Sequence, residues 1–551
     1  MARQLLVTSA LPYANGDIHI GHLVEYIQTD IFVRFQKLIG NQCTYICADD
    51  THGTPIMLNA KQRGVTPEAL IAEFNSRHQN DFKRFNVAFD YYGSTHTQEN
   101  QKLAEKIYYD AQNINAIECR NIDQLYDQKE KMFLPDRFVK GTCPTCKAVD
   151  QYGDSCEQCS ETYSPQDLLN PYSTLTGEPP ITKSSTHYFF KVSQFQDIIE
   201  SWLATNPVRQ EIKNKLQEWF DIGLKDWDIS RDEPYFGFKI PNTDNKYFYV
   251  WVDAPIGYIS TTQIWAKQHQ VDYLTFWKND NVEIHHFIGK DILYFHTLFW
   301  PAMLHIGGYN LPTKINIHGF LTVNGEKMSK SKGTFITAQD FAQQFNPEFL
   351  RYYYAAKLSG SSEDIDLNLN DFMHKINADV LGKFINIASR LGGILHKHCQ
   401  GKLTTIDPNG NSLIQTIQDQ QQKIETQYNE LALNKAMITI MTCADHTNKY
   451  IDENTPWSVA KENPGKAAQI ITTGLNACRL IALYLKPVLP EIVKGIETFL
   501  NTSPFLWTDS KILLENHSIN SYVHLAERIK SDDLIKFQDL LAPDESTVTS
   551  I

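Results

Sequence analysis

The sequence predicts a multidomain α/β protein in which a parallel-sheet domain, interrupted by a cysteine-bearing insertion, is followed by an α-helical bundle. Strand and helix patterns alternate on both sides of the insertion, which is typical of a parallel sheet with helical connections. Helical periodicity without strand patterns then prevails from about residue 350 to Leu500. With 551 residues, the chain also exceeds what one hydrophobic core usually supports.

The first half of the predicted sheet domain spans residues 1–115. The apolar run at residues 5–9 indicates a buried strand, and a loop with Pro12, Asn15 and Gly16 follows it. A helix is expected next, because apolar residues recur at helical spacing at Ile20, Leu23, Ile27 and Ile31. A second strand is predicted at residues 43–47, just before Asp49-Asp50, and helical stretches follow.

Three further regions complete the predicted organisation. Residues 116–230 are expected to form the insertion, with short turn-rich pieces and then amphipathic stretches around Trp202 and Trp219. Residues 231–350 return to strand-like runs at 247–252, 284–288 and 315–317, which should rejoin the first sheet. Residues 351–551 are the predicted helical domain and tail, with an apolar stripe at Leu381, Phe384, Ala388, Leu391 and Leu395.

Composition limits the classes of function. The net charge of −13 argues against indiscriminate binding to nucleic acid, so any such site must be local. No run approaches the roughly 18 uninterrupted apolar residues of a membrane span. The first residues also lack the features of a signal peptide. We therefore expect a cytoplasmic protein with no membrane segment.

Four of the ten cysteines lie close together and predict a metal site. Cys143 and Cys146 form one Cys-x2-Cys pair, and Cys156 and Cys159 form a second pair after nine intervening residues. Four thiolates suit tetrahedral zinc and leave no open position for water, so one structural zinc ion is predicted in a knuckle. A metal-free or redox-active knuckle is the alternative.

Two separated segments point to ATP chemistry. His19-Ile20-Gly21-His22 lies where a loop enters a helix, whose N-terminus attracts phosphate, and Gly21 would let a flat base approach the backbone. Lys327-Met328-Ser329-Lys330-Ser331 lies in a Gly-bounded loop whose ammonium groups could close over a triphosphate. Taken singly, the first segment is better explained as two ordinary surface histidines at a helix start, and the second as a solvated basic turn.

Together the two segments resemble the two signatures of class I aminoacyl-tRNA synthetases. The resemblance extends to Leu11-Pro12-Tyr13-Ala14-Asn15-Gly16, to residues 48–55 and 227–231, to Asp253-Ala254-Pro255-Ile256-Gly257-Tyr258 and to residues 287–291. It covers nearly the whole chain and is closest to the methionyl branch. The insertion is too short for the large hydrolytic domain that the leucine, isoleucine and valine enzymes of this class carry.

The resemblance implies a Rossmann-like catalytic domain that activates L-methionine with ATP and transfers it to tRNA-Met. Magnesium is expected with the polyphosphate. The implied catalytic residues are His19, His22, Lys327, Lys330 and Arg231. The implied ATP-binding residues are Tyr13, Gly21, Gly289, Asp291 and Lys330.

The resemblance also implies a methionine pocket, which needs an adaptable apolar slot with polarizable aromatic groups. The implied residues are Leu11, Tyr13, Asp50, Trp251, Ala254, Pro255, Tyr258, His296 and Phe299, with Asp50 pairing with the ammonium group. Core packing is the alternative for Trp251, Pro255 and Phe299. Asp50 could also cap the following helix.

A local basic helix is the candidate tRNA site. Residues 374–402 carry a net charge of +4, from five basic residues and one acidic one, in a chain of −13. Asn386 and Arg390 can hydrogen-bond base edges, and Trp457 offers a plane for stacking. The resemblance places these three at the CAU anticodon. A solvated helix face, and Trp457 as core, are the alternatives.

Two other functions remain open on the residues alone. A nucleotidyltransferase without tRNA would use the ATP segments but not the basic helix, and a tRNA-binding protein without catalysis would need no ATP segments. Longer members of the family carry a further C-terminal module that dimerises them. The sequence ends at Ile551, so a monomer is expected.

Overall fold

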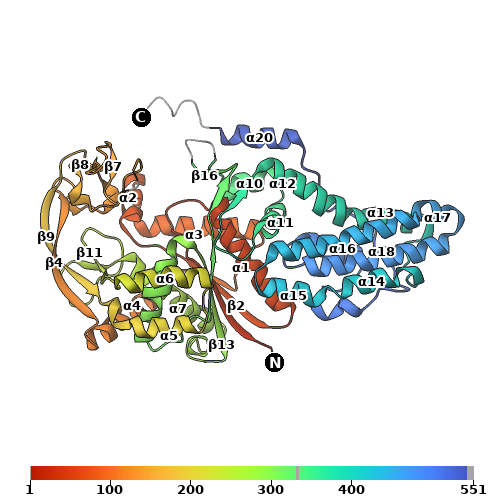
Figure 1. Ribbon diagram of the computed structural model, residues 1–551, viewed down its shortest axis with the longest axis horizontal. Helices are drawn as coiled ribbons and strands as arrows, with labels where there is room; N and C mark the ends of the chain where they lie inside the picture. Colours follow the sequence, from red (N-terminus) through yellow and green to blue (C-terminus); the bar gives the residue numbers. More distant parts are fainter. Residues whose placement is uncertain (1, 160, 330–333, 543–551) are drawn as a thin grey trace.

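A computed structural model describes residues 2–159, 161–329 and 334–542. The molecule is elongated, with the strands of the insertion at one end, the parallel sheet in the middle and the helical domain at the other end (Figure 1). The two largest apolar cores of the described residues follow this arrangement. One core lies between the sheet and the insertion helices, and the larger one runs from the first helix through the helical domain.

The central sheet has five parallel strands in the order β14-β13-β1-β2-β3. These are β1 (Gln4–Ser9), β2 (Gln42–Asp49), β3 (Tyr91–Ser94), β13 (Val282–Gly289) and β14 (Lys314–His318). The predicted parallel sheet is confirmed, as are its strands at residues 5–9, 43–47, 284–288 and 315–317. Since strand order reverses between β1 and β13, a crevice is expected at their carboxyl ends.

The predicted strand at residues 247–252 is wrong. Residues 246–248 form the short β12 (Lys246–Phe248), which pairs with β11 (Ser230–Asp232) away from the main sheet, and α7 (Val250–Gln268) begins two residues later. Most of α7 is buried on all sides, so its apolar run shows no polar face. A short apolar run of this kind cannot be assigned to strand or helix by its periodicity.

Helices cover the sheet and connect its strands. They are α1 (Ile20–Leu38), α2 (Thr54–Arg63), α3 (Pro67–Arg84), α4 (Gln98–Asn113), α8 (Leu274–Trp277) and α9 (Trp300–Ile306). The predicted helix after the first loop is α1, and its residues Ile20, Leu23, Ile27 and Ile31 are fully buried.

The insertion is built on a long antiparallel ladder. β4 (Ile117–Asp127) pairs with β9 (Ile181–Phe190) from Ile117 opposite Phe190 to Tyr126 opposite Ile181, and β10 (Trp227–Asp228) extends β9 on its other edge. Only short pieces were expected here. The cysteine pairs lie in the loops that connect a separate small sheet of β6 (Val139–Thr142), β7 (Gln151–Tyr152) and β8 (Leu169–Ser173). α5 (Gln196–Ala204) and α6 (Gln210–Ile222) are the predicted Trp-bearing stretches.

A small sheet and two helices connect the catalytic core to the helical domain. β15 (Leu321–Val323) pairs with β16 (Glu326–Lys327) and in parallel with β17 (Ile365–Leu367), so the expectation that strands end near residue 350 is wrong. Three residues are too few to give a periodic pattern. α10 (Ala338–Gln344) and α11 (Pro347–Lys357) pack beside α1.

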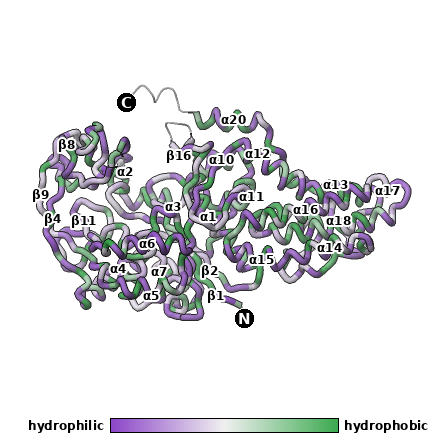
Figure 2. The backbone as a smooth tube through the Cα atoms, in the orientation of Figure 1, coloured by the Kyte–Doolittle hydropathy of each residue, from purple (hydrophilic) through white to green (hydrophobic). Residues whose placement is uncertain are grey.

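From residue 369 to Leu500 the chain is mainly helical, as predicted, and one further helix, α20, follows a largely irregular segment. Its elements are α12 (Leu369–Lys375), a π-helical stretch (Ile376–Ile385), α13 (Asn386–Cys399), α14 (Asn411–Gln418), α15 (Gln421–Asn429), α16 (Leu433–Asn454), α17 (Pro456–Glu462), α18 (Pro464–Leu485), α19 (Pro490–Phe499) and α20 (Ser531–Leu541). The apolar stripe from Leu381 to Leu395 is buried, and apolar and polar residues alternate along these helices (Figure 2).

One helix of the described residues is long and apolar enough to cross a membrane by composition. It is α18, and 94% of its most apolar stretch is buried inside the structure. The rest of the helical domain therefore covers its apolar surface.

Candidate active site and metal site

A cavity of about 1180 Å³ opens at the carboxyl ends of β1, β2 and β13. Both halves of the sheet domain and the insertion contribute to its wall. The predicted site residues on the wall are Leu11, Tyr13, His19, Gly21, His22, Asp50, Arg231, Trp251, Ala254, Pro255, Tyr258, Gly289, Asp291, His296 and Lys327. Phe299 does not line it, and Lys330 lies outside the described residues. The structure thus brings together residues from distant parts of the chain.

His19 and His22 form the entrance to α1. His19 is the N-cap: its Nδ1 accepts a hydrogen bond from the backbone N–H of His22 (3.2 Å), and Nδ1 of His22 accepts one from the backbone N–H of His19 (3.3 Å). The two rings stack with centroids 3.6 Å apart. These rings line the cavity, which favours the ATP-binding interpretation over ordinary surface histidines.

The capping geometry fixes the proton of each ring. Because both Nδ1 atoms accept, the proton of each neutral imidazole lies on Nε2. Burial lowers the pKa of His19 to about 4 and holds the pKa of His22 well below its ordinary value. Both rings are therefore neutral near pH 7. Each keeps one N–H donor beside a helix N-terminus that already favours anions.

Met328, in the described part of the lysine-rich segment, lies against Gly21 of the histidine segment. A Cβ on Gly21 would lie 2.4 Å from Cε of Met328 and 3.0 Å from the His19 ring, so only glycine fits between them without a shift. Backbone hydrogen bonds join Ile20 N to Ile336 O (3.0 Å) and Ala338 N to Ile18 O (2.8 Å). Lys327, on β16, is exposed beside this contact. The two segments form one site.

Aromatic groups build the apolar part of the cavity. The hydroxyl of Tyr258 is 2.9 Å from Nε2 of His296, and Nδ1 of His296 is 3.1 Å from the carbonyl oxygen of Ile292. The carbonyl requires a proton on Nδ1, so Tyr258 donates to Nε2. Burial lowers the pKa of His296 to about 4, which keeps this ring neutral.

Of the two predicted pocket residues Trp251 and Phe299, only Trp251 lines the cavity. Trp251 lines the cavity and stacks on Phe295 with centroids 4.2 Å apart and planes at 10°. Phe299 instead packs against Trp227 (4.2 Å) and supports the wall from behind. Sequence reasoning did not identify Phe295 as the residue under Trp251.

Asp50 supplies a buried acidic group that has no ion-pair partner in the part of the chain that the structure describes. Its Oδ1 is buried with no hydrogen-bond partner among the described residues, and burial together with the charge of Asp253 raises its pKa well above the ordinary value. The helix-cap alternative is wrong, because α2 is capped at Gly53. A cationic group bound here would satisfy the orphaned oxygen and restore the ionised carboxylate.

Glu25 and His318 are cavity residues that sequence reasoning missed. Oε1 of Glu25 accepts from the backbone N–H of Ala10 (2.5 Å), and Oε2 lies 3.2 Å from Nε2 of His318. The two side chains reach the wall from α1 and β14. The spacing offered a clue for Glu25, which follows His22 by three residues and therefore shares its helix face.

The four clustered cysteines have the geometry of a metal site. Their Sγ atoms all lie within 4.8 Å of one another, with Cys143 to Cys159 at 3.8 Å and Cys146 to Cys156 at 3.4 Å. A tetrahedral ion with metal–sulfur bonds of about 2.3 Å requires sulfurs about 3.8 Å apart. The cluster could thus hold a metal, as predicted. Cys43, Cys47 and Cys478 are buried elsewhere in the structure.

The charge of the candidate tRNA face is closer to neutral than the +4 of residues 374–402 suggested. Arg390 pairs with Asp452 (3.1 Å) and Lys383 pairs with Asp445 (2.9 Å), and both acids come from α16. The Arg390 guanidinium also lies 4.9 Å from the ring of Trp457, which is 36% exposed. The interpretation of Trp457 as core is therefore wrong, and the two residues form one exposed site.

Comparisons with known proteins agree with this geometry. The family model "tRNA synthetases class I (M)" matches residues 5–392, and "Anticodon binding domain of methionyl tRNA ligase" matches residues 402–539. The chain is 53% identical over 534 residues to a methionine–tRNA ligase of Thiobacillus denitrificans, covering 96% of this chain and 77% of that protein.

Solved structures share the fold. Mycobacterium tuberculosis methionyl-tRNA synthetase in complex with methionyl-adenylate has a TM-score of 0.80 at 23% identity, covering 96% of this chain and 100% of that one. The apo form of that synthetase has a TM-score of 0.73 at 20% identity, over 96% and 99% of the two chains. By its family models and its 53% identical relative, the chain belongs to the methionyl family of class I tRNA synthetases.

Proposed function

We propose that the protein is a methionine–tRNA ligase that makes methionyl-adenylate and then methionyl-tRNA-Met. In the first step a carboxylate oxygen of methionine attacks the α-phosphorus of ATP, and the bond to the pyrophosphate oxygen breaks. In the second step a hydroxyl of the 3′-terminal adenosine attacks the methionyl carbonyl carbon, and AMP leaves. The observation that carries the proposal is one cavity with an uncompensated acid, Asp50, and two neutral histidine donors, His19 and His22.

Asp50 and the aromatic wall would hold the amino acid. The orphaned Oδ1 of Asp50 fits an ammonium group, which would keep the carboxylate ionised. Trp251 and the Tyr258–His296 pair offer a polarizable apolar surface to a thioether, which has little hydrogen-bonding capacity. Leu11, Tyr13, Ala254 and Pro255 complete the lining, and Phe299 supports it indirectly through Trp227.

Donors and cations at the other side of the cavity would hold ATP. The Nε2–H groups of His19 and His22 and the N-terminus of α1 suit phosphate oxygens that gain negative charge during the displacement. Lys327 and Arg231 add positive charge, and Lys330 belongs to the same basic segment. Gly21, Gly289 and Asp291 would contact the nucleoside, and magnesium would accompany the polyphosphate.

The reaction needs charge stabilisation and alignment more than a general base, because the attacking carboxylate is already ionised. This agrees with the low pKa of His19, which at about 4 leaves the ring unable to deliver a proton near pH 7. The histidines therefore act as fixed dipolar donors.

The other two sites would serve structure and tRNA choice. Zinc is the proposed ion at Cys143, Cys146, Cys156 and Cys159, because four thiolates in a tetrahedron leave no position for a substrate. Asn386, Arg390 and Trp457 would read the CAU anticodon, with Trp457 and Arg390 at the first base. The zinc assignment rests on the four-thiolate donor set, and the anticodon assignment rests on the family resemblance, supported by the exposed contact between Arg390 and Trp457.

Methionine-dependent exchange of labelled pyrophosphate into ATP tests the proposed function. Methionine should support exchange, and leucine or valine should not. Asp50→Asn should raise the KM for methionine about 10- to 100-fold, because it removes a hydrogen bond between charged groups. Asp110→Asn, on the exposed part of α4, is the control and should change neither constant. Exchange driven by leucine or valine would refute the assignment to methionine.

A further inference from the structure

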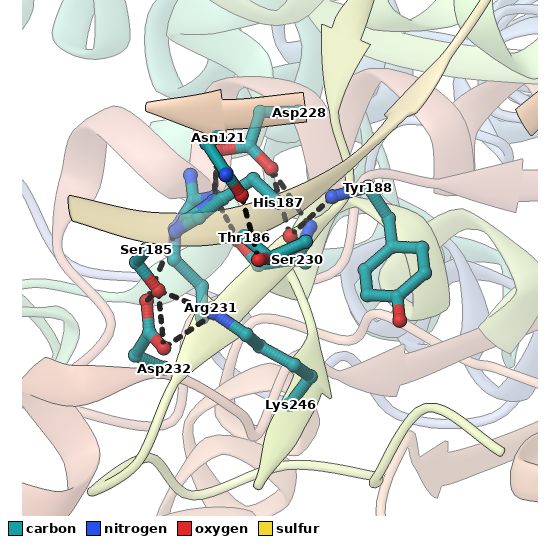
Figure 3. Close-up of polar contacts among 10 residues, drawn as sticks. All are labelled: Asn121, Ser185, Thr186, His187, Tyr188, Asp228, Ser230, Arg231, Asp232 and Lys246. Atoms are coloured by element: carbon teal, nitrogen blue, oxygen red, sulfur yellow. Dashed lines mark hydrogen bonds and ion pairs between the residues drawn. The ribbon is translucent and has the colours of Figure 1, made fainter. Parts of the chain in front are cut away.

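A polar cluster at the base of the insertion surrounds Arg231 (Figure 3). His187 on β9 is 1% exposed, with Nδ1 2.7 Å from Oδ2 of Asp228 and Nε2 2.9 Å from Oδ2 of Asp232. These two acids lie three residues before and one residue after Arg231 in the chain. A single buried ring therefore bridges the carboxylates on both sides of a cavity arginine.

The ring must carry two protons to satisfy this arrangement. A carboxylate without a proton accepts hydrogen bonds but donates none, so both nitrogens of His187 have to donate. Burial opposes a charged ring, but the hydrogen bonds to Asp228 and Asp232 outweigh it and raise the pKa of His187. Burial likewise opposes ionisation of Asp228, yet its contacts with His187 and Arg231 lower its pKa.

Each carboxylate is also held by a second group. Oδ1 of Asp228 accepts from the backbone N–H (3.1 Å) and the hydroxyl (3.0 Å) of Ser230. Asp232 accepts from the hydroxyl of Ser185 (2.9 Å) and pairs with the ammonium of Lys246, which also donates to Ser185 (2.7 Å). The acids are thus fixed from β9, β11 and β12 together.

This distribution of charge determines how strongly the neighbouring acids attract the guanidinium of Arg231. Its guanidinium lies 3.7 Å from the ring of Tyr249, donates to the carbonyl of Ser230 (2.6 Å), and is 3.4 Å from Asp228. Charged His187 and Lys246 balance the two acids, so the charge of Arg231 stays available to an anion in the cavity. If His187 were neutral, Arg231 would be the main group balancing the charge of Asp228, and this attraction would pull the guanidinium away from the cavity.

We propose that His187 is a positioning residue for Arg231: its imidazolium holds Asp228 and Asp232 so that the guanidinium faces the reacting phosphate and carboxylate. This inference rests on the proposed function, in which Arg231 stabilises charge during methionine activation. The base of the insertion would then influence the rate of methionine activation.

Pyrophosphate exchange in His187→Gln tests the proposal. The amide can donate from only one nitrogen and carries no charge, so kcat should fall about 10- to 100-fold, as expected for a displaced catalytic group. The KM for methionine should stay within about twofold, because the groups proposed to bind methionine lie elsewhere on the cavity wall. A KM increase with an unchanged kcat would overturn the proposal.

Thr186→Ala is the matched control. Thr186 is the neighbour of His187 on β9, is exposed, and donates to Oδ1 of Asn121 (2.7 Å) outside the cluster (Figure 3). Its kcat should equal that of the wild type. If His187→Gln does not fold, Asp232→Asn, which keeps the ring and removes one carboxylate charge, must lower kcat in the same way. Wild-type kcat in Asp232→Asn would also overturn the proposal.

The charge on the ring is measurable without any reaction. Nitrogen-15 spectra of the histidine rings should show His187 doubly protonated at pH 7, and a neutral tautomer there would refute the proposal. The charged side chains that face the ring are Asp228, Asp232, Arg231 and Lys246, with Arg120 opposite it on β4. If the wild type showed no methionine-dependent exchange, the proposed function would fail, and this spectrum would still decide the state of His187.

Discussion

The buried pair Arg351–Asp30 offers a quantitative test of how the helical domain is joined to the active-site helix. Asp30 lies on α1, the helix that carries His22 in its first turn, and its Oδ2 is 2.7 Å from an Nη of Arg351 on α11. Both side chains are fully buried. Arg351 also donates to the carbonyls of Pro487 (2.9 Å) and Val488 (2.9 Å), just before α19.

The structure predicts unequal costs for removing the two partners. Arg351→Met leaves Asp30 paired with Arg34 (2.6 Å), whereas Asp30→Asn leaves Arg351 buried without its carboxylate. Breaking a buried pair costs about 3–5 kcal/mol. We therefore expect about 3 kcal/mol for Arg351→Met, and a larger loss, near the upper end of that range, for Asp30→Asn. The double variant should recover about 2 kcal/mol of the summed losses.

Urea unfolding followed by tryptophan fluorescence and far-ultraviolet dichroism measures these free energies where the two curves coincide. The control cycle is Lys106 with Asp110, an exposed pair on α4 for which about 0.3–0.5 kcal/mol is expected. A coupling energy for Asp30 and Arg351 no larger than this control would refute the reasoning.

The coupling energy between Asp30 and Arg351 should fall only under strongly acidic conditions. Burial opposes ionisation of Asp30, but Arg34 and Arg351 outweigh it and lower the pKa of Asp30. A lowered carboxyl pKa contributes stability above the unfolded value of about 3.9 and loses it as pH falls through the folded value. The coupling energy should therefore be equal at pH 7 and pH 5.5.

Three further predictions concern the separate sites. Gly21→Ala should lower pyrophosphate exchange about 100-fold, because its Cβ would displace the His19 ring or Met328, and an unchanged rate would contradict the proposed contact. Metal analysis should find about one zinc ion per chain in the wild type and in Cys119→Ser, but little in Cys156→Ser; equal content in all three would exclude the cysteine site. Arg390→Ala should lower kcat/KM for charging tRNA-Met about 10- to 100-fold while exchange stays unchanged. Loss of both activities in folded protein would contradict that division of roles.

Local pattern was sufficient to predict the first two elements that present the active site, but not α7, whose start was predicted as a strand. β1 and α1 follow from residues within about ten positions of one another, and the cap at His19 is a local structure. The cysteine site was predictable for the same reason, since each Cys-x2-Cys pair lies in a short turn.

Long-range pairing was not predictable from one sequence. Nothing near Arg390 indicates that Asp452 will neutralise it from α16, and nothing near Glu25 indicates His318. The position of Phe299 behind the cavity wall was unpredictable for a related reason. A helical turn decides which aromatic residue faces the cavity, and residues 295–299 are π-helical, which shifts that face from the ordinary spacing.

The connection through Arg351 bears on how the proposed anticodon recognition would serve catalysis. α1 carries His22 at its first turn, Glu25 on the cavity wall and Asp30 at its centre, so one rigid helix links the cavity to the buried pair. Glu348, also on α11, accepts from the backbone N–H groups of residues 491 and 492 at the start of α19 (2.8 Å each). A rigid link of this kind sets the distance between two sites, but it changes the affinity of one site for its ligand only if it has two arrangements. We therefore infer that the helical domain places the acceptor end of tRNA-Met at the cavity. On this basis a defect at Arg390 should appear in the transfer step and not in adenylate formation.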